Sequence, residues 1–301
     1  MASRTDSARR RILLTGHSGF TGHYVRCELE AAGHEVIGLA QTHSGAEQPV
    51  DLLDQSALSA AVRVAAPDAV IHLAAIAFVA HDDVELLYRV NVAGTRNLLA
   101  ALAALPQPPR AVILASSANV YGNVSAESID ENTAPAPSND YAVSKLAMEY
   151  MARLWLDRLP ITLVRPFNYT GVGQGAQFLI PKIVDHFRRG ARVIELGNTG
   201  IARDFLDVRA VAVAYARLLE AAPAGAVLNL CSGRARTLAE VLALMAEIAG
   251  YAIEVRVNPA FVRSHEVRRL VGSDARLRDC IGALPQIAFA DTLRWMYAQP
   301  V

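Results

Sequence analysis

Short apolar runs alternate with amphipathic stretches along the first half of the chain. Nearly continuous apolar runs are typical of strands buried on both faces of a sheet, and here they occupy residues 12–14, 35–39, 69–73, 111–115 and 161–164. Between them, apolar side chains recur at helical spacing, which predicts helices over residues 20–32, 84–105 and 141–159. This alternation predicts an α/β fold in which helices cover both faces of a doubly wound parallel sheet.

The pattern changes after residue 168. The expected elements become shorter, namely helices over residues 178–189, 208–220, 238–249 and 292–298 and strands over 193–196, 227–230 and 253–257. We therefore predict a larger Rossmann-type domain over residues 1–168, with a flexible tail at 1–10, and a smaller mixed domain over residues 169–301. Some segments of the smaller domain are expected to return to the first sheet.

Composition narrows the classes of function. The chain has 301 residues, of which 52% are hydrophobic, and its 29 basic residues balance its 29 acidic ones. Without a basic surplus to neutralise phosphates, nucleic-acid binding is a poor interpretation. Three widely spaced cysteines, Cys27, Cys231 and Cys280, favour neither a disulfide framework nor a metal site, and they fit a reducing cytoplasm. No apolar stretch approaches the roughly 20 residues that a membrane span needs.

A glycine-rich turn follows the first expected strand. Gly16, Gly19 and Gly22 have the spacing GxxGxxG, and they lie between that strand and the helix that begins at residue 20. Such a turn lets the backbone approach a pyrophosphate closely, and the free N–H groups of the helix N-terminus attract phosphates. The motif therefore predicts a dinucleotide site. We interpret His17 and His23, which flank the turn, as loop or helix-surface residues.

A second motif pairs a phenol with an amine. Tyr141 and Lys145 are four residues apart, so their side chains share one face of the expected helix. A free tyrosine has a pKa of about 10, and a nearby ammonium lowers it, which favours proton transfer at neutral pH. Only two of the 29 basic residues are lysines; we interpret the other one, Lys182, as a surface residue. Ser117 follows an expected strand end, where its hydroxyl is suited to polarise a carbonyl group.

These three elements, in this order and spacing, resemble the extended short-chain dehydrogenase/reductase family. Three further features agree with it: the segment HLAA at residues 72–75, the pair Asp51-Leu52, and Asn91 within a helix. The resemblance implies that Ser117, Tyr141 and Lys145 are catalytic and that the cofactor is NAD or NADP. The residues implied to bind the cofactor are Gly16, Ser18, Gly19, Phe20, Thr21, Gly22, Asp51, Leu52, Leu73, Ala74, Ala75, Tyr141, Lys145 and Pro166. The choice between NAD and NADP stays open, because residues 40–41, after the second strand, include neither an acid nor an arginine.

The second half resembles a narrower group within the family. The segment RPFNYTGVGQ at residues 165–174 is similar to that of reductases acting on GDP-4-keto-6-deoxy-D-mannose, except that Tyr169 replaces the usual histidine and Val172 the usual proline. Residues 203–208, 229–233 and 263–267 continue the similarity. It implies reduction of a C4 ketone on a GDP-linked sugar, which gives GDP-D-rhamnose or its C4 epimer. The residues implied to hold this substrate are Ser117, Asn168, Arg203, Arg263 and Glu266.

Other activities of the family depend on other residues. A 4,6-dehydratase needs carboxylates beside the serine, and epimerase/reductases of the fucose-synthase type carry a cysteine directly after it, but this chain has Ala118 and Asn119 there. A nucleotide-sugar 4-epimerase and a reductase of a dTDP-linked 4-keto-6-deoxy sugar both stay open. A non-catalytic NAD(P)-binding sensor would typically have lost Tyr141 or Lys145. The family also implies a homodimer paired through the helices at 84–105 and 141–159, although packing against the core explains their apolar faces equally well.

Overall fold

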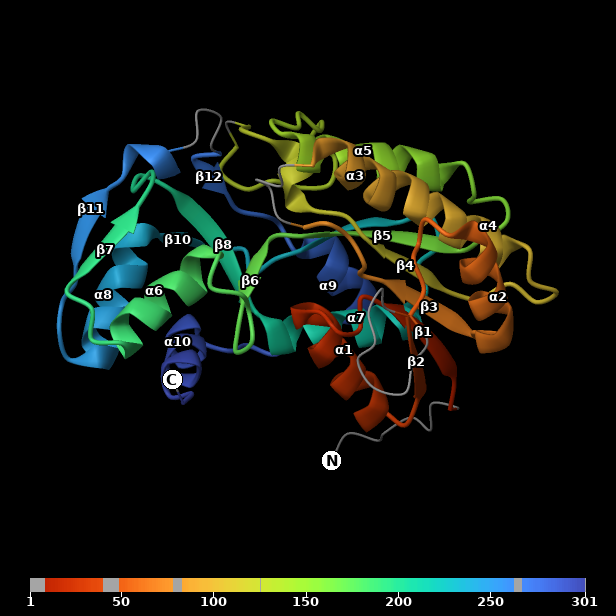
Figure 1. Cartoon of the computed structure of the whole chain (residues 1–301), viewed down its shortest axis with the longest axis horizontal. Helices are drawn as coiled ribbons and strands as arrows, with labels where there is room; N and C mark the ends of the chain where they lie inside the picture. The colour runs from red at the N-terminus through yellow and green to blue at the C-terminus, as the bar shows by residue number, and fades with distance from the viewer. Residues whose placement is uncertain (1–8, 40–48, 78–82, 125, 263–266, 301) are drawn as a thin grey trace.

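The computed structural model describes residues 9–39, 49–77, 83–124, 126–262 and 267–300. Its larger sheet has six parallel strands in the order β2-β1-β3-β4-β5-β9. The strands are β1 (Arg11–Thr15), β2 (Glu35–Leu39), β3 (Ala69–His72), β4 (Val112–Ala115), β5 (Ile161–Pro166) and β9 (Val227–Leu230). The last of these comes from the second half of the chain and pairs with β5. The predicted α/β fold with a doubly wound parallel sheet is confirmed (Figure 1).

Helices cover both faces of this sheet because alternate strand residues point to opposite sides. Ile12 and Leu14 pack in the layer that contains α1 (Phe20–Ala31) and α7 (Val208–Ala221), while Leu13 packs in the opposite layer. That opposite layer contains α2 (Gln55–Ala65), α4 (Thr95–Ala103) and α5 (Asp140–Arg153). Figure 1 shows the two layers above and below the sheet.

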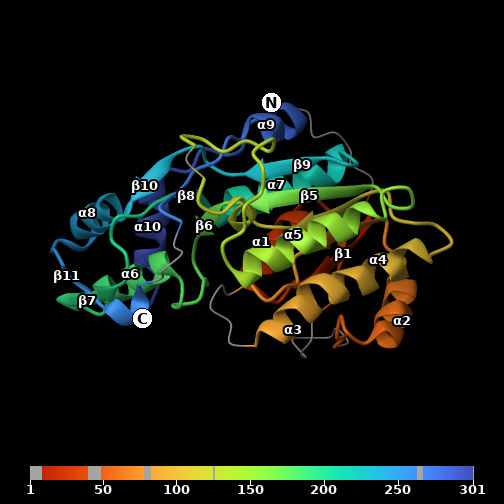
Figure 2. The same ribbon diagram turned by 90° about the horizontal axis from the view of Figure 1, so that it is seen from above.

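A smaller lobe lies beside the carboxyl ends of the large sheet (Figure 2). Its mixed sheet is built around β8 (Ala202–Asp207), which pairs with β6 (Asn168–Thr170), β10 (Ala235–Thr237) and β12 (Arg269–Leu270). A second, two-stranded sheet pairs β7 (Val193–Leu196) with β11 (Glu254–Val257). The lobe's helices are α6 (Leu179–Arg188), α8 (Leu238–Ala249) and α10 (Phe289–Tyr297), whose apolar faces form its core. A short helix, α9 (Ala275–Ile281), returns to pack on α7.

Several elements differ from the expectation. The single helix expected over residues 84–105 is α3 (Val84–Tyr88), a π turn at Arg89–Gly94 and then α4. The helix expected over 141–159 ends at Arg153, because the chain makes turns there before it reverses into β5. Helices α2 and α9 and strands β6, β8, β10 and β12 were not expected. Within the expected tail, Arg10 is placed by an ion pair of 3.0 Å with Glu220, and residues 1–8 lie outside the described ranges.

Candidate active site

The glycine turn between β1 and α1 has the shape of a phosphate cradle. Gly16 has a φ of +72°, and a Cβ there would lie 2.8 Å from the backbone nitrogen of Ala74. A Cβ at Gly22 would lie 2.1 Å from the carbonyl oxygen of Gly16, so only glycine lets α1 pack this closely on the turn. The helix begins at Phe20 without a side-chain cap, which leaves its first N–H groups for an anion. These residues therefore fit the pyrophosphate of a dinucleotide.

A cleft of about 1610 Å³ runs from this turn along the carboxyl ends of the central strands to α6. Open α/β sheets bind their ligands at this edge. The volume exceeds the roughly 300–1,000 Å³ of common ligand sites, so the cleft has room for a dinucleotide and a second ligand. Every residue predicted to bind the cofactor lines it, as do Ser117, Asn168 and Arg203. The other two predicted substrate residues, Arg263 and Glu266, lie outside the described residues.

Ser117, Tyr141 and Lys145 meet at the end of β4. The side chain of Asn139 caps the N-terminus of α5 and so fixes where the tyrosine and the lysine lie. Tyr141 and Ser117 are hydrogen-bonded through their side chains. Lys145 donates from Nζ to the carbonyl oxygen of Ala115 over 2.8 Å. The structure thus brings the three predicted catalytic residues together on one wall of the cleft.

Burial shifts the pKa of two of these groups. It raises the pKa of Tyr141 to about 12, although the hydrogen bond with Ser117 lowers it in part. The sequence predicts that the neighbouring lysine lowers the pKa of Tyr141. The pKa is raised instead, because burial removes the water that would stabilise the phenolate. Burial also lowers the pKa of Lys145 to about 8, and the charge of Glu149 opposes that change. The ammonium form of Lys145 therefore predominates at neutral pH.

A buried chain of hydrogen bonds connects the glycine turn to α5. The hydroxyl of Thr15 lies 2.6 Å from Nδ1 of His72, and Nε2 of the same ring lies 2.9 Å from the hydroxyl of Thr95. Because that hydroxyl donates to the carbonyl of Asn91, it accepts from His72, which places the ring proton on Nε2. Asn91 then donates from its side chain to Ser144 over 3.0 Å. Burial lowers the pKa of His72 to about 3, so the ring is neutral at neutral pH and this row of hydrogen bonds carries no charge.

Among the predicted substrate residues, Asn168 has the geometry that most directly suits a ligand. Its Nδ2 is buried, and no described residue accepts a hydrogen bond from it. A buried donor without a partner is costly, so a ligand oxygen in the cleft is its natural acceptor. Arg203 also lines the cleft, where its guanidinium donates to the carbonyl oxygens of Ala202 and Arg268.

Tyr169, the departure from the usual histidine, lies between the two lobes. Its hydroxyl is 2.7 Å from that of Thr21 at the start of α1, and its ring stacks on Phe20 with a centroid separation of 6.1 Å. One turn further along α1, Tyr24 donates to the carbonyl oxygen of Val172 over 2.8 Å. The segment that resembles GDP-sugar reductases is therefore fastened to the phosphate cradle.

Two residues occupy places that the sequence did not indicate. Lys182 is half-buried rather than free on the surface: it lines the cleft from α6, donates to the carbonyl oxygen of Glu195 over 2.7 Å and places Nζ 4.4 Å from the ring centre of Phe261. The rarity of lysine in this chain was a signal for it as much as for Lys145. His17, a residue of the glycine turn itself, is buried and only 4% exposed, whereas His23 is exposed on α1 as expected.

The family model described as the NAD dependent epimerase/dehydratase family matches residues 12–231. The chain belongs to this family. Its named relatives include the GDP-6-deoxy-D-mannose reductase of Pseudomonas aeruginosa, 38% identical over 95% of this chain and 95% of its own length. The GDP-6-deoxy-D-talose 4-dehydrogenase of Aggregatibacter actinomycetemcomitans is 32% identical over 90% of this chain and 91% of its own length. The protein is therefore an NAD(P)-dependent enzyme of the nucleotide-sugar oxidoreductase and epimerase class.

Solved structures agree with this assignment. A Burkholderia cenocepacia J2315 protein, described only as a proposed epimerase, is 52% identical with a TM-score of 0.90, over 97% of this chain and 98% of its own. The structure of RMD from Pseudomonas aeruginosa complexed with NADPH is 36% identical with a TM-score of 0.85, over 96% and 97% of the two chains. Within the described ranges of the present family member, no helix has the length and apolarity to cross a membrane. Those ranges also hold no group of three His, Cys, Asp or Glu side chains placed for a metal ion.

Proposed function

We propose that this enzyme uses NADPH or NADH to reduce the C4 ketone of a nucleotide-linked 4-keto-6-deoxyhexose. The proposed substrate is GDP-4-keto-6-deoxy-D-mannose, and the product is GDP-D-rhamnose or its C4 epimer. The supporting observation is that Ser117, Tyr141 and Lys145 meet on one wall of a cleft that begins at a phosphate cradle. The names of the two relatives support the sugar, because 6-deoxy-D-mannose and 6-deoxy-D-talose differ only at C4.

Each of the three side chains has a task that its surroundings support. Ser117 donates a hydrogen bond to the ketone oxygen, and Tyr141 gives that oxygen its proton as negative charge develops there. A phenol with a pKa of about 12 stays protonated at neutral pH and loses its proton only to a stronger base, such as a forming alkoxide. Lys145 stabilises the phenolate that is left and faces the cofactor ribose. When bound, the reduced cofactor supplies the hydride.

The two lobes divide the binding work in this proposal. Residues 1–168, with the cradle and the strand ends, hold the cofactor, and NADPH in the Pseudomonas aeruginosa structure supports NADP without excluding NAD. Residues 169–301 mainly hold the sugar nucleotide, although β9 belongs to the larger sheet. Asn168 donates from its unpaired Nδ2 to the substrate. Arg203, Arg263 and Glu266 contact the nucleotide.

A nucleotide-sugar 4-epimerase is the second candidate. The 52% identical Burkholderia cenocepacia protein, described as a proposed epimerase, favours it. An epimerase oxidises and re-reduces the same carbon, so the same serine, tyrosine and lysine suffice. A dTDP-linked ketosugar is the alternative substrate of the reductase. A non-catalytic sensor is disfavoured because Tyr141 and Lys145 are both present and lie on the same cleft wall.

One experiment separates these candidates. Purified protein is mixed with GDP-4-keto-6-deoxymannose or its dTDP counterpart and with NADPH or NADH, and cofactor absorbance and product NMR are followed. We expect reduced cofactor to be consumed with the GDP-linked sugar and a single configuration to form at C4. A parallel reaction holds GDP- or UDP-hexoses and oxidised cofactor, and interconversion of these sugars without net cofactor consumption would instead identify an epimerase. Absence of turnover with every sugar would refute both.

We also propose that the enzyme is a cytoplasmic homodimer. The outer face of α5 exposes Val143 and Tyr150, and Leu154 at the end of the helix continues this face; 38%, 57% and 78% of their surfaces are accessible. An apolar strip of this kind on a helix that already covers the sheet suits a second copy of the chain. Sedimentation equilibrium tests the pairing, and Leu154→Glu is expected to weaken it. A monomeric wild-type protein would refute it.

A further inference from the structure

Helix α5 carries a third residue in line with the catalytic pair. Three residues of this helix, each one turn from the next, contact three consecutive residues at the end of β4. The contacts are Tyr141 with Ser117, Lys145 with Ala115 and Glu149 with Ser116. In the last of them, the Ser116 hydroxyl donates to Oε1 of Glu149 over 2.5 Å. The proposed reaction uses the first two residues of this row and gives Glu149 no task.

Glu149 forms a buried ion pair with Arg165 of β5. Two nitrogens of the guanidinium donate to the two carboxylate oxygens, over 2.8 Å and 2.6 Å, and the side chains are 0% and 3% exposed. The remaining guanidinium nitrogen, Nη1, donates to the hydroxyl of Tyr121 over 3.0 Å. The pair thus holds the turn 116–121 at its first residue and at its last, and Ser117 lies between these two points.

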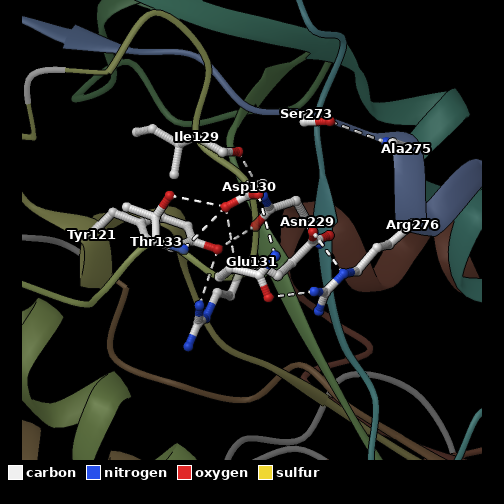
Figure 3. Close-up of polar contacts among 11 residues, drawn as sticks. Tyr121, Ile129, Asp130, Glu131, Thr133, Asn229, Ser273, Ala275 and Arg276 are labelled. Atoms are coloured by element: carbon white, nitrogen blue, oxygen red, sulfur yellow. Dashed lines mark hydrogen bonds and ion pairs between the residues drawn. The ribbon is translucent and has the colours of Figure 1, made fainter.

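The far side of this turn is braced as well. The Tyr121 hydroxyl donates to Oδ1 of Asn229 on β9 over 2.7 Å, and Nδ2 of Asn229 donates to the carbonyl oxygen of Ile129 over 2.9 Å. The backbone N–H of Asn229 donates to Glu131 over 2.7 Å, and Arg276 of α9 lies 3.6 Å from the same carboxylate. Figure 3 shows these side chains gathered around Asn229. Tyr121, which accepts a hydrogen bond from the ion pair, is therefore itself held by β9 and, through Asn229, by Ile129 and Glu131.

A buried ion pair is a poor way to gain stability. Its desolvation cost often exceeds its attraction, and apolar residues of the same volume usually stabilise a core as well or better. Neither Glu149 nor Arg165 lines the cleft, so neither touches the ligands directly. Their contacts, by contrast, all lead to the catalytic turn or to the helix that carries Lys145. This combination indicates a role in placing other residues.

We infer that the Glu149–Arg165 pair positions the active site: it holds Ser117 toward Tyr141 and places a negative charge one turn from the ammonium of Lys145. Glu149 and Arg165 are thus positioning residues. The inference rests on the proposed function, because it assigns work to Ser117 and Lys145 as that function defines it. It adds to that function the groups that hold those two residues in place.

The charges around Lys145 give the inference an electrostatic consequence. Tyr141 shares its helix and His72 lies on β3; both are neutral at neutral pH, because burial raises the pKa of the first and lowers that of the second. Arg165 on β5 is charged and pairs with Glu149, but of these two charges the carboxylate is the one that acts on the pKa of Lys145. The carboxylate of Glu149 is therefore the charge that opposes desolvation of the lysine, whose pKa lies at about 8. Removing that charge must lower the pKa of Lys145 further.

The chain's two lysines make this directly measurable. With lysine labelled with ¹³C at Cε, NMR of the isolated protein gives two signals, which a Lys182→Arg variant assigns. We expect Lys145 to titrate near pH 8 in the wild type and at least about one pH unit lower in Glu149→Gln, with Lys182 unmoved. The matched control is Thr162→Val, which removes a buried hydroxyl hydrogen bond to Pro223, 2.9 Å long, from the same strand as Arg165. It should leave both titrations as they are.

Kinetics test the other half of the inference. Ser116→Ala removes one of the two links from the ion pair to the catalytic turn, the one next to Ser117, and leaves the pair and its contact with Tyr121 intact. We expect kcat to fall about 10- to 100-fold, with the KM of the reduced cofactor and the titration of Lys145 unchanged. Thr162→Val should keep the wild-type kcat. A Ser116→Ala variant with wild-type kcat would overturn the positioning role of the turn contact.

A double variant covers the case in which Glu149→Gln fails to fold. Glu149→Leu with Arg165→Met removes both buried charges at similar volume, so the core should persist. We expect it to fold, to titrate Lys145 below the wild-type pH and to lose kcat. A folded double variant with wild-type titration and wild-type kcat would show that the pair only fills space. If the wild type turns over no nucleotide sugar, the proposed function fails, while the NMR titration still decides the charge coupling.

Discussion

At the scale of a single residue, His72 makes the fold sensitive to acid. Its ring is completely enclosed between Thr15 and Thr95, and burial lowers its pKa from 6.5 to about 3. Between these two values the unfolded chain binds a proton that the folded protein does not. The stabilising contribution of the neutral ring is therefore complete above pH 6.5 and is lost progressively as the pH falls toward 3.

We predict that His72→Gln flattens this acid dependence. In the wild type, the free energy of unfolding should fall by up to about 1.4 kcal/mol per pH unit below pH 6.5 from this residue alone. Urea unfolding at several pH values, compared between the wild type and His72→Gln, measures the difference in slope. His23→Gln, an exposed histidine on α1, should keep the wild-type slope. Equal slopes in all three proteins would show that His72 does not resist protonation.

Tyr141 carries a prediction on the reaction itself. Tyr141→Phe keeps the ring and removes the proton donor, so kcat should fall by about 10²- to 10⁴-fold while the affinity for NADPH changes little. Steady-state kinetics and NADPH fluorescence titration measure the two effects. Tyr150→Phe, on the exposed face of the same helix, is the control and should be neutral. The catalytic assignment is wrong if Tyr141→Phe retains most of the wild-type rate.

At the scale of an element, α1 depends on close packing against the turn that precedes it. In Gly22→Ala the new methyl group would lie 2.1 Å from the carbonyl oxygen of Gly16, so the helix must move away from the cradle. We predict that NADPH binding weakens at least about tenfold, because the free N–H groups at the helix start lose their alignment with the phosphates. Fluorescence titration measures the binding. Gly200→Ala, where a Cβ meets nothing within 4 Å, is the control and should bind as the wild type does.

The elements also show how far the sequence could lead. All six strands of the large sheet, β9 at 227–230 included, were predictable because they are short, largely apolar runs. The spacing of Tyr141 and Lys145 placed the pair on one helix face. Strands β6, β10 and β12 are only 3, 3 and 2 residues long, too short for an alternating pattern to stand out. Glu149 continues the row of the catalytic pair, yet in the sequence it resembles any helical acid. Its importance comes from Arg165, which only the folded sheet brings to it.

At the scale of the whole molecule, hydrogen bonds fasten the two lobes to each other beside the cleft. Tyr169 of β6 contacts Thr21, and Tyr24 contacts Val172, so two hydrogen bonds connect α1 to β6 and to the residues that follow this strand. Cofactor and substrate are proposed to bind on opposite sides of these two hydrogen bonds. Breaking one of them should therefore affect the affinity for the cofactor and the affinity for the sugar.

We predict that Tyr169→Phe raises both the Kd of NADPH and the KM of the sugar about five- to tenfold. The loss of one hydrogen bond worth about 1 kcal/mol has an effect of this size. The variant keeps the ring that stacks on Phe20, so the fold should persist. Tyr251→Phe removes a comparable bond, 2.9 Å to the carbonyl of Phe187, but within the smaller lobe alone. If both variants behave alike, the contact between the lobes has no special part in binding.

The π turn at Arg89–Gly94 contains one residue more than a regular α-helix would place there. Deleting a single amino acid from it would join α3 and α4 into one regular helix and leave both in their present orientation, because the wider π turn already absorbs the extra residue. Asn91, inside the turn, would then point in another direction and lose its contacts with Ser144 and with the backbone of Ile76. Among relatives of this enzyme, a one-position gap in that stretch would thus signal a differently connected interior, even where every neighbouring letter agrees.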